Sequence, residues 1–180
     1  GSYMIKQLVF GVVALSMVPS ESESASIAEA GEFHTALSEQ VCLANNIYWE
    51  ARNQTEEGMI GVGLVVRNRV LDDRFPHSYC EVVHQGPTRP SWRDPDVKIP
   101  VRHRCQFSWY CDGKSDDIVA NELDIYTVAS DIAHRIYSGA IDDVTNGATH
   151  YHADYVIPAW AATKIRTIKL DDHIFYRWEF

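Results

Sequence analysis

Glu50 is the residue whose surroundings best fit acid catalysis. It lies in the stretch NIYWEARNQ, between Trp49 and the small residue Ala51, in the last turn of a predicted helix. Apolar rings beside a carboxyl group disfavour its charged form and raise its pKa. Such a group can protonate a glycosidic oxygen near neutral pH. Glu50 is therefore the candidate general acid, although most helix glutamates are only solvated surface charges.

A second set of residues could bind a metal ion. His150, His152 and Asp154 form an H-x-H-x-D run. In a strand, alternate residues share one face, so all three side chains could meet one zinc ion. Glu50 would then be the base to a metal-bound water. This metal site is the alternative to acid catalysis by Glu50 alone.

Apolar spacing predicts the helix that carries Glu50. Steps of three and four residues separate Val41, Ala44, Ile47, Tyr48 and Ala51, which is the period of one helical face. The predicted helix covers about residues 38–52.

Two more helices are predicted further along the chain. Thr55 can cap a helix that runs to about residue 70, with Ile60, Gly63, Leu64 and Arg67 on related faces. The glycines at positions 58, 61 and 63 are poor helix formers, but they permit close packing. The third helix is expected to begin with a cap at residue 115 and to end before the glycine at 139.

Strands are expected near the C-terminus. Residues 148–156, 167–170 and 173–180 have strand character, with turns at Asn146-Gly147 and Asp171-Asp172. Residues 71–114 contain five of the seven prolines and are predicted to be a long functional loop region, with short strands or a hairpin near CQFSWYCDG. The expected fold class is α+β.

Length and charge restrict the class of protein. The 180 residues fit one domain with a substantial core. The net charge of -9, without a Lys/Arg run, disfavours nucleic-acid binding. We expect a monomer without a cofactor.

The N-terminal segment has the pattern of an export signal. Residues 1–3 resemble a cloning remnant, and the apolar run of residues 8–18 is too short to span a bilayer comfortably. Ser26-Ile27-Ala28 offers a cleavage site. We expect residues 1–28 to be a targeting segment, 29–37 a linker and 38–180 the catalytic domain, located in the periplasm or cell envelope. A retained helix that docks on the domain, or transient membrane association, is the alternative.

Four cysteines agree with export because an oxidising compartment permits disulfides. The short gap between Cys105 and Cys111 makes a local bond easy, which would leave Cys42 with Cys80, but other pairings stay open. A zinc site is disfavoured because no C-x-x-C occurs.

Five separated motifs in the right order resemble the cell-wall hydrolases of the spore cortex-lytic (SleB) type. They are NIYWEAR, EEGMIGVGLVVRNRV, FPHSYCEVVHQG, CQFSWYCDG, and GATHYHADYVIPAW with the later HIFYR. The resemblance covers about residues 38–177 and implies a lysozyme-like glycosidase that cleaves peptidoglycan. It places the family's catalytic glutamate on Glu50.

Some positions depart from the family pattern. Asn53 and Gln54 replace the Gly-Glu of the E-A-R-G-E motif, and Met59 stands where Gln is frequent. Asp171 replaces the Gly of the terminal I-G-x-H. Asn53 could replace glycine by adopting the left-handed conformation. None of these changes affects Glu50.

The resemblance favours a one-acid lytic transglycosylase reaction at the bond between N-acetylmuramic acid (MurNAc) and N-acetylglucosamine (GlcNAc). Hydrolysis by two carboxylates would need a second acid about 5 Å away for retention or roughly 6.5–9.5 Å for inversion. Asp112 and Asp154 are the candidates for that acid. A zinc-dependent amidase using the H-x-H-x-D run and a non-catalytic wall-binding module are further alternatives.

The expected substrate-binding residues lie in two motifs. Gln106 and Ser108 could bind sugar hydroxyls from the predicted hairpin, with Phe107 and Trp109 pointing the opposite way. Trp109 is also expected to contact the sugar. Tyr151 and His152 belong to the segment that the family places near the site, where the Tyr151 hydroxyl could orient Glu50. Arg52 could pair with an acid to brace the helix end or contact the substrate, and the structural role is the one expected.

Overall fold

The computed structural model describes residues 20–179, and the chain divides into two compact units, residues 1–34 and 35–180. The first long helix, α1 (Glu21–Ala51), begins well before residue 38. The expected linker, residues 29–37, is therefore helical, and its described part in the first unit is exposed. The apolar run of residues 8–18 lies outside the described residues, and the domain limits stay a prediction. Between residues 20 and 179 no helix is long and apolar enough to cross a membrane.

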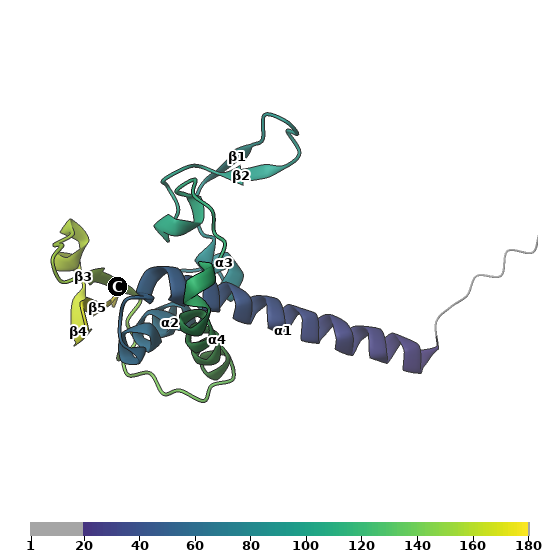
Figure 1. Cartoon of the computed structure of the whole chain (residues 1–180), viewed down its shortest axis with the longest axis horizontal. Helices are drawn as coiled ribbons and strands as arrows, with labels where there is room; N and C mark the ends of the chain where they lie inside the picture. The colour runs from purple at the N-terminus through teal and green to yellow at the C-terminus, as the bar shows by residue number, and fades with distance from the viewer. Residues whose placement is uncertain (1–19, 180) are drawn as a thin grey trace, which may run out of the picture. The chain divides into compact units, whose positions relative to one another are not determined.

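Three helices build the core of the second unit: the C-terminal part of α1, α2 (Glu56–Val70) and α4 (Leu123–Tyr137) (Figure 1). Ile47 and Ile136 are buried where these helices meet. A Cβ atom on Gly63 would lie 2.6 Å from Cδ1 of Ile136 and 2.8 Å from Cδ1 of Ile47. The close packing predicted from the glycines is therefore confirmed at this position.

The expected helix ends are correct in two cases and wrong in one. Thr55 is the N-cap of α2, and Gly139 follows α4 with φ of +77°. Ser115 does not cap α4, and its hydroxyl instead donates to the Asp117 carboxylate at 2.7 Å. The helix begins at Leu123, after the 3-10 helix η2 (Ala120–Glu122).

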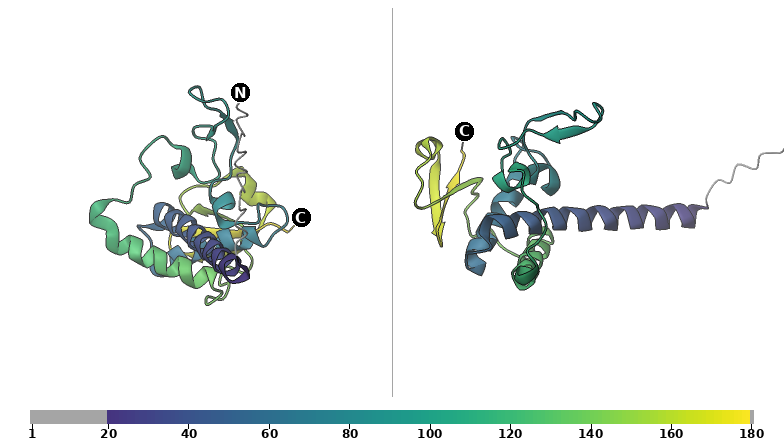
Figure 2. Two further views of the ribbon diagram at one scale, coloured as in Figure 1. Left: turned by 90° about the vertical axis from the view of Figure 1, so that its right-hand side faces the viewer. Right: turned by 45° about the horizontal axis from the view of Figure 1, so that its top comes forward.

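The C-terminal strands form a three-stranded antiparallel sheet in the order β3-β5-β4. The strands are β3 (His150–Ala153), β4 (Ile165–Leu170) and β5 (His173–Arg177), with the 3-10 helix η3 (Ala159–Thr163) between β3 and β4. The predicted turns are confirmed, since Asn146, Gly147 and Asp171 have positive φ. Phe175 of β5 packs on α2 at Gly61, where a Cβ would lie 2.7 Å from the ring. The sheet thus rests on α2 (Figure 2).

The prediction of a hairpin near CQFSWYCDG is wrong. Residues Ser108–Cys111 form the 3-10 helix η1, in which the Tyr110 amide donates to the Phe107 carbonyl. A hairpin does occur earlier, between β1 (Thr88–Pro90) and β2 (Lys98–Pro100), and it stands away from the helices (Figure 1). The Cys105–Cys111 disulfide encloses η1, so the residues between these cysteines form a 3-10 turn instead of paired strands.

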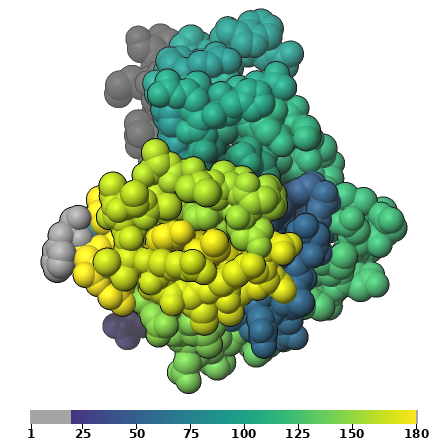
Figure 3. Space-filling model, turned by 90° about the vertical axis from the view of Figure 1, so that its left-hand side faces the viewer, coloured from purple at the N-terminus to yellow at the C-terminus, as the bar shows by residue number. Residues whose placement is uncertain are grey.

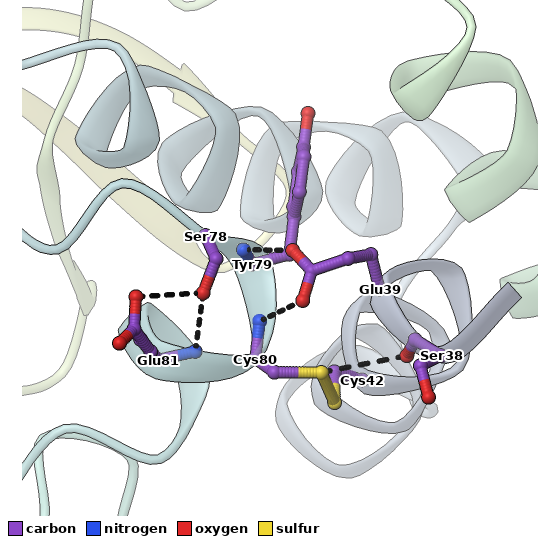
Figure 4. Close-up of a disulfide and its surroundings, with 7 residues drawn as sticks. All are labelled: Ser38, Glu39, Cys42, Ser78, Tyr79, Cys80 and Glu81. Atoms are coloured by element: carbon purple, nitrogen blue, oxygen red, sulfur yellow. Dashed lines mark hydrogen bonds between the residues drawn. A yellow bond between two sulfur atoms is a disulfide. The ribbon is translucent and has the colours of Figure 1, made fainter. Parts of the chain in front are cut away.

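The second disulfide joins α1 to the short helix α3 (Tyr79–Val83). Cys42 and Cys80 are 38 residues apart in sequence, and their Cα atoms are 5.1 Å apart. Beside this bond, the Glu39 carboxylate accepts hydrogen bonds from the amides of Tyr79 and Cys80 at 2.5 and 3.4 Å (Figure 4). The pairing that local geometry favoured is the one the structure contains.

Candidate active site

Two cavities meet at Glu50, the last residue but one of α1. The sheet-side cavity has a volume of about 150 Å³ and is lined by Glu50, Arg69, Gln106, Phe107, His150, Tyr151 and Trp160. The loop-side cavity has a volume of about 280 Å³ and is lined by Trp49, Glu50, Arg52, Ser108, Trp109, Asp112, Lys114, Ser115 and Asp116. Glu50 is common to both linings, so its carboxyl group can be reached from either cavity.

Segments far apart in sequence build the sheet-side cavity. Its walls come from the end of α1, from α2, from the chain just before η1, and from β3 and η3. The face drawn in Figure 3 shows the yellow-green C-terminal segments next to the teal segment that precedes η1. The sheet therefore contributes one wall of the cavity that Glu50 of α1 also lines.

The environment of Glu50 favours its protonated form. The side chain is half-buried, and its Oε2 atom accepts a hydrogen bond of 2.7 Å from the Tyr151 hydroxyl. Burial raises the pKa of Glu50, while the Tyr151 hydrogen bond and the charge of Arg69 oppose part of that rise. A carboxyl group in this state can donate a proton and later accept one.

Tyr151 is held as a hydrogen-bond donor by its place in β3. It pairs with Phe175 of β5, and its ring packs on His173 and Phe175 at centroid distances of 5.0 and 5.6 Å. Burial and the neighbouring Glu50 raise the pKa of Tyr151 well above its ordinary value. The phenol therefore keeps its proton and can orient the carboxylate of Glu50.

Arg69 is a site residue that the sequence analysis missed. It is 3% exposed, its Nε donates to the Thr149 carbonyl at 2.7 Å, and its guanidinium lies between the rings of Phe75 and Phe107. Burial lowers the pKa of Arg69 to about 10, so it remains charged near neutral pH. The signal was its spacing, because 62, 65, 66 and 69 are the positions of one buried helical face.

The aromatic residues of the loop-side cavity are fixed by one another. Trp49 and Trp109 stack at 6.4 Å with an interplanar angle of 20°. The Trp109 indole donates to Oδ1 of Asn46 at 3.0 Å. The rings next to Glu50 thus form a firm apolar wall, as the neighbourhood of Trp49 in sequence suggested.

The expected substrate-binding residues are divided between the two cavities. Gln106 is exposed in the sheet-side lining, whereas Ser108 and Trp109 are in the loop-side lining. Tyr151 contacts Glu50 directly. His152 lies in neither lining, because its ring stacks on Tyr176 and its nitrogens are near the Ala153 carbonyl and the Tyr176 hydroxyl.

The residues of the H-x-H-x-D run have separate partners. Asp154 accepts a hydrogen bond of 2.6 Å from Lys169, and His150 is near the Thr149 hydroxyl. In residues 20–179 no group of three or more His, Cys, Asp or Glu side chains is arranged to hold a metal ion. Of the two candidates for a second acid, only Asp112 shares a cavity lining with Glu50.

Arg52 braces the helix end, as expected. Its Nη1 atom is 3.1 Å from the Glu122 carboxylate and 3.2 Å from the Tyr48 hydroxyl. The left-handed conformation proposed for Asn53 is wrong, since the described non-glycine residues with positive φ are His103, Asn146 and Asp171. Residue 53 continues the turn after α1 with an ordinary φ, so no glycine is required there.

Asp171 takes over the glycine position of the terminal motif. Its φ is +48°, a left-handed conformation that Asp accepts more readily than most residues. Its carboxylate accepts hydrogen bonds from the amide and hydroxyl of Thr55 at the start of α2. This residue therefore ties the β4–β5 turn to the helix that carries Arg69.

Comparison with known proteins agrees with this arrangement. Residues 53–176 match the family model described as cell wall hydrolase, a match that begins three residues after Glu50. The catalytic domain of the SleB protein from Bacillus cereus is similar in structure, with a TM-score of 0.56 and 22% identity over 78% of this chain and 91% of that one.

A second solved structure, described as the catalytic domain of a germination-specific lytic transglycosylase SleB from Bacillus anthracis, is similar with a TM-score of 0.54 and 22% identity. That match covers 77% of this chain and 93% of the other. No curated protein sequence matches. The predicted α+β, lysozyme-like fold is confirmed. Because the family match covers most of its length, the chain belongs to the cell wall hydrolase family and is a peptidoglycan-degrading enzyme.

Proposed function

We propose that this enzyme is a lytic transglycosylase that cleaves the β-1,4 bond between MurNAc and GlcNAc. Glu50 donates its proton to the glycosidic oxygen as the bond to the anomeric carbon breaks. The resulting carboxylate then takes the proton of the same MurNAc residue's 6-hydroxyl, whose oxygen bonds to the anomeric carbon. The product is a 1,6-anhydro ring, no water is consumed, and Glu50 ends in its starting state.

The observation that carries this proposal is the position and state of Glu50. It lies where the two cavities meet, so parts of a bound substrate can lie on both sides of its carboxyl group. Burial raises its pKa, which supports proton donation, and the Tyr151 hydroxyl at 2.7 Å supports the ionised state that follows. The two opposed influences suit a group that must act first as an acid and then as a base.

The one-acid scheme also fits the distribution of the other carboxylates. Asp154 is paired with Lys169 outside both cavities. The N-acetyl group of the substrate can stabilise the positive charge at the anomeric carbon, so no second carboxylate is required. One of the two similar structures is described as a lytic transglycosylase, which supports the same reaction.

Mass spectrometry of the soluble products from purified peptidoglycan tests the proposal. Transglycosylation gives 1,6-anhydromuropeptides, whereas hydrolysis gives reducing ends that are heavier by one water. Free stem peptides would instead identify an amidase. Products that all carry reducing ends, with oxygen from labelled water, would overturn the proposal.

Hydrolysis with Asp112 as second acid is the alternative that a specific observation favours. Asp112 lies in the loop-side lining with Glu50 and is partly shielded from solvent. It could activate water on the far side of the scissile bond. In that case Asp112→Asn would abolish activity as fully as Glu50→Gln, which the one-acid scheme does not predict.

Action on peptidoglycan supports the expectation of export. The substrate lies outside the cytoplasmic membrane, and both disulfides are compatible with an oxidising compartment. We therefore propose that the enzyme acts in the periplasm or cell envelope as a monomer.

A further inference from the structure

The sheet-side cavity contains a cation without a matching anion. Arg69 is 3% exposed, and its Nη1 atom is buried without a hydrogen-bond partner among the described residues. Within residues 20–179 it forms no ion pair, so Glu50 influences it only at longer range. A buried charge normally has a paired or hydrogen-bonded partner. The missing partner of Arg69 is therefore expected to be supplied by a ligand.

A second cation, Lys164, lies close to a residue that lines the sheet-side cavity. The Lys164 ammonium lies 5.6 Å from the ring of Trp160, which lines the cavity, and 5.0 Å from the ring of Trp178. Among the described residues Lys164 forms no ion pair. Arg74 is also close to Trp178, but Asp72 neutralises it. One cation, Arg69, thus lines the cavity, and a second, Lys164, lies behind the Trp160 ring, in a chain whose net charge is -9.

His150 is another basic side chain in this region, and it is uncharged near neutral pH. Burial, together with the charges of Arg69, Lys164 and Arg74, lowers the pKa of His150 to about 4, so the ring is neutral near pH 7. Glu50 is the one acid in the sheet-side lining, and its raised pKa favours the uncharged form. The loop-side lining, in contrast, contains Asp112 and Asp116 beside Arg52 and Lys114.

The size of the cavity indicates a substituent. Its volume of about 150 Å³ has room for a small polar group rather than for a whole sugar ring and its neighbours. The lactyl group on a MurNAc residue has about five non-hydrogen atoms beyond its ether oxygen, and three of them are the carbon and the two oxygens of a carboxyl group. GlcNAc is otherwise the same sugar without this substituent.

We propose that the sheet-side cavity is a carboxylate subsite, in which Arg69 binds and Lys164 attracts an anionic group carried by the lactyl substituent of the MurNAc residue beside Glu50. The inference rests on the proposed function, since cleavage of the MurNAc–GlcNAc bond brings MurNAc to that position. The carboxylate comes either from the lactyl group itself, where no stem peptide is attached, or from the stem. Arg suits such a group because its donors match both carboxylate oxygens.

Binding of matched probes tests the subsite without catalysis. Chemical shift titrations of the whole protein would use GlcNAc, N-acetylmuramic acid and N-acetylmuramoyl-L-alanyl-D-isoglutamine. The expected result is at least about tenfold tighter binding of one muramoyl probe than of GlcNAc, as for a charge-assisted hydrogen bond of about 1.5 kcal/mol or more. Preference for N-acetylmuramic acid identifies the lactyl carboxylate, and preference for the dipeptide identifies the stem.

Variants of Arg69 and Lys164 test whether these two cations cause the preference for a muramoyl probe over GlcNAc. Lys164→Met should reduce it several-fold, and Arg69→Gln should abolish it. Lys98→Met is the matched control, because it removes the same charge from an exposed residue of β2 and should retain the full preference. Because Arg69 is buried, a melting curve of Arg69→Gln must show that this variant is folded. If it does not fold, the result for Lys164→Met decides whether the inference holds.

Two results would overturn the inference. One is equal affinity of the wild type for GlcNAc and both muramoyl probes, and the other is an unchanged preference in Lys164→Met. Glu50→Gln separates this inference from the proposed reaction, since that variant should lose cleavage but keep the probe preference. Reducing-end products from the wild type would therefore contradict the transglycosylase proposal while leaving a measured carboxylate preference in place.

Discussion

The sheet-side and loop-side cavities share Glu50 but differ in charge and construction. The sheet-side lining holds the buried Arg69, with Lys164 behind Trp160, and has no acid other than Glu50. The loop-side lining is larger and places Asp112 and Asp116 next to Lys114. The same carboxyl group is thus exposed to a positive region on one side and to a mixed region on the other.

This difference explains how one residue can be suited to two protonation states. Burial between the cavities favours the neutral acid, while Arg69 and the Tyr151 hydroxyl act from the sheet side to stabilise the carboxylate. Acids in the loop-side lining give no such support, since like charges disfavour ionisation. Both influences that favour the ionised form of Glu50 therefore come from residues of the sheet-side lining.

The largest effect is expected from Glu50→Gln, which removes the group that both cavities share. Activity on peptidoglycan should fall by about 10³-fold or more, at the upper range of general acid–base contributions, while the fold is retained. Glu57→Gln is the matched control, because Glu57 is exposed on α2. Turnover near the wild-type rate in Glu50→Gln would remove this residue from the centre of the reaction.

A smaller effect is expected from Tyr151→Phe on the sheet side alone. Loss of the 2.7 Å hydrogen bond should reduce activity roughly 10- to 100-fold, corresponding to about 1.5–3 kcal/mol for a bond to a charged group. That bond lowers the pKa of Glu50, so its removal should raise the pKa further and move the alkaline limb of the pH–rate profile upward. Tyr155→Phe, at an exposed tyrosine, should leave both quantities unchanged, and a downward shift in Tyr151→Phe would contradict the assigned role.

Asp112→Asn tests whether the loop-side cavity supplies a second catalytic acid. The account predicts a loss of less than about tenfold and unchanged anhydro products, since a general acid or base would contribute about 10²-fold or more. The measurement is initial rate together with product masses. A loss as large as that of Glu50→Gln would mean that the two cavities share the catalytic work.

The smallest effect concerns stability. A raised pKa in the fold means that protonated Glu50 stabilises the protein fully below its ordinary pKa of 4.5, and that this stability is lost as pH rises through the folded pKa. Gln does not ionise. Glu50→Gln should therefore melt a few degrees above the wild type at pH 8 and at the same temperature at pH 4, whereas a lower melting temperature at pH 8 would show that ionised Glu50 is stabilising.

Much of the framework that holds Glu50 could be predicted from the sequence. The face through Ile47 and Ala51, the Thr55 cap and the Asp171 turn are local patterns, so short-range spacing reports them. The position of Tyr151 opposite Glu50 came from family resemblance. Its physical basis is the pairing of β3 with β5 and the packing of β5 on α2, contacts between distant segments.

The missed features depend on tertiary structure. The sequence analysis named Arg67 among residues on related faces of α2 and did not name Arg69, the arginine that is buried and lines a cavity with Glu50. A shift of two residues around a helix decides which arginine enters the cavity, and apolar spacing alone did not resolve it. The structure has the 3-10 helix η1 where a hairpin was expected, yet Gln106 and Ser108 are exposed while Phe107 and Trp109 are buried.

The most direct test of the account is the titration of the Glu50 carboxyl group by NMR. With ¹³C-labelled glutamate, the Glu50 signal is the one absent from the Glu50→Gln spectrum. The account predicts a pKa above the ordinary 4.5, and a higher value again in Tyr151→Phe. A wild-type pKa at or below 4.5 would contradict the claim that burial between two cavities makes Glu50 the acid.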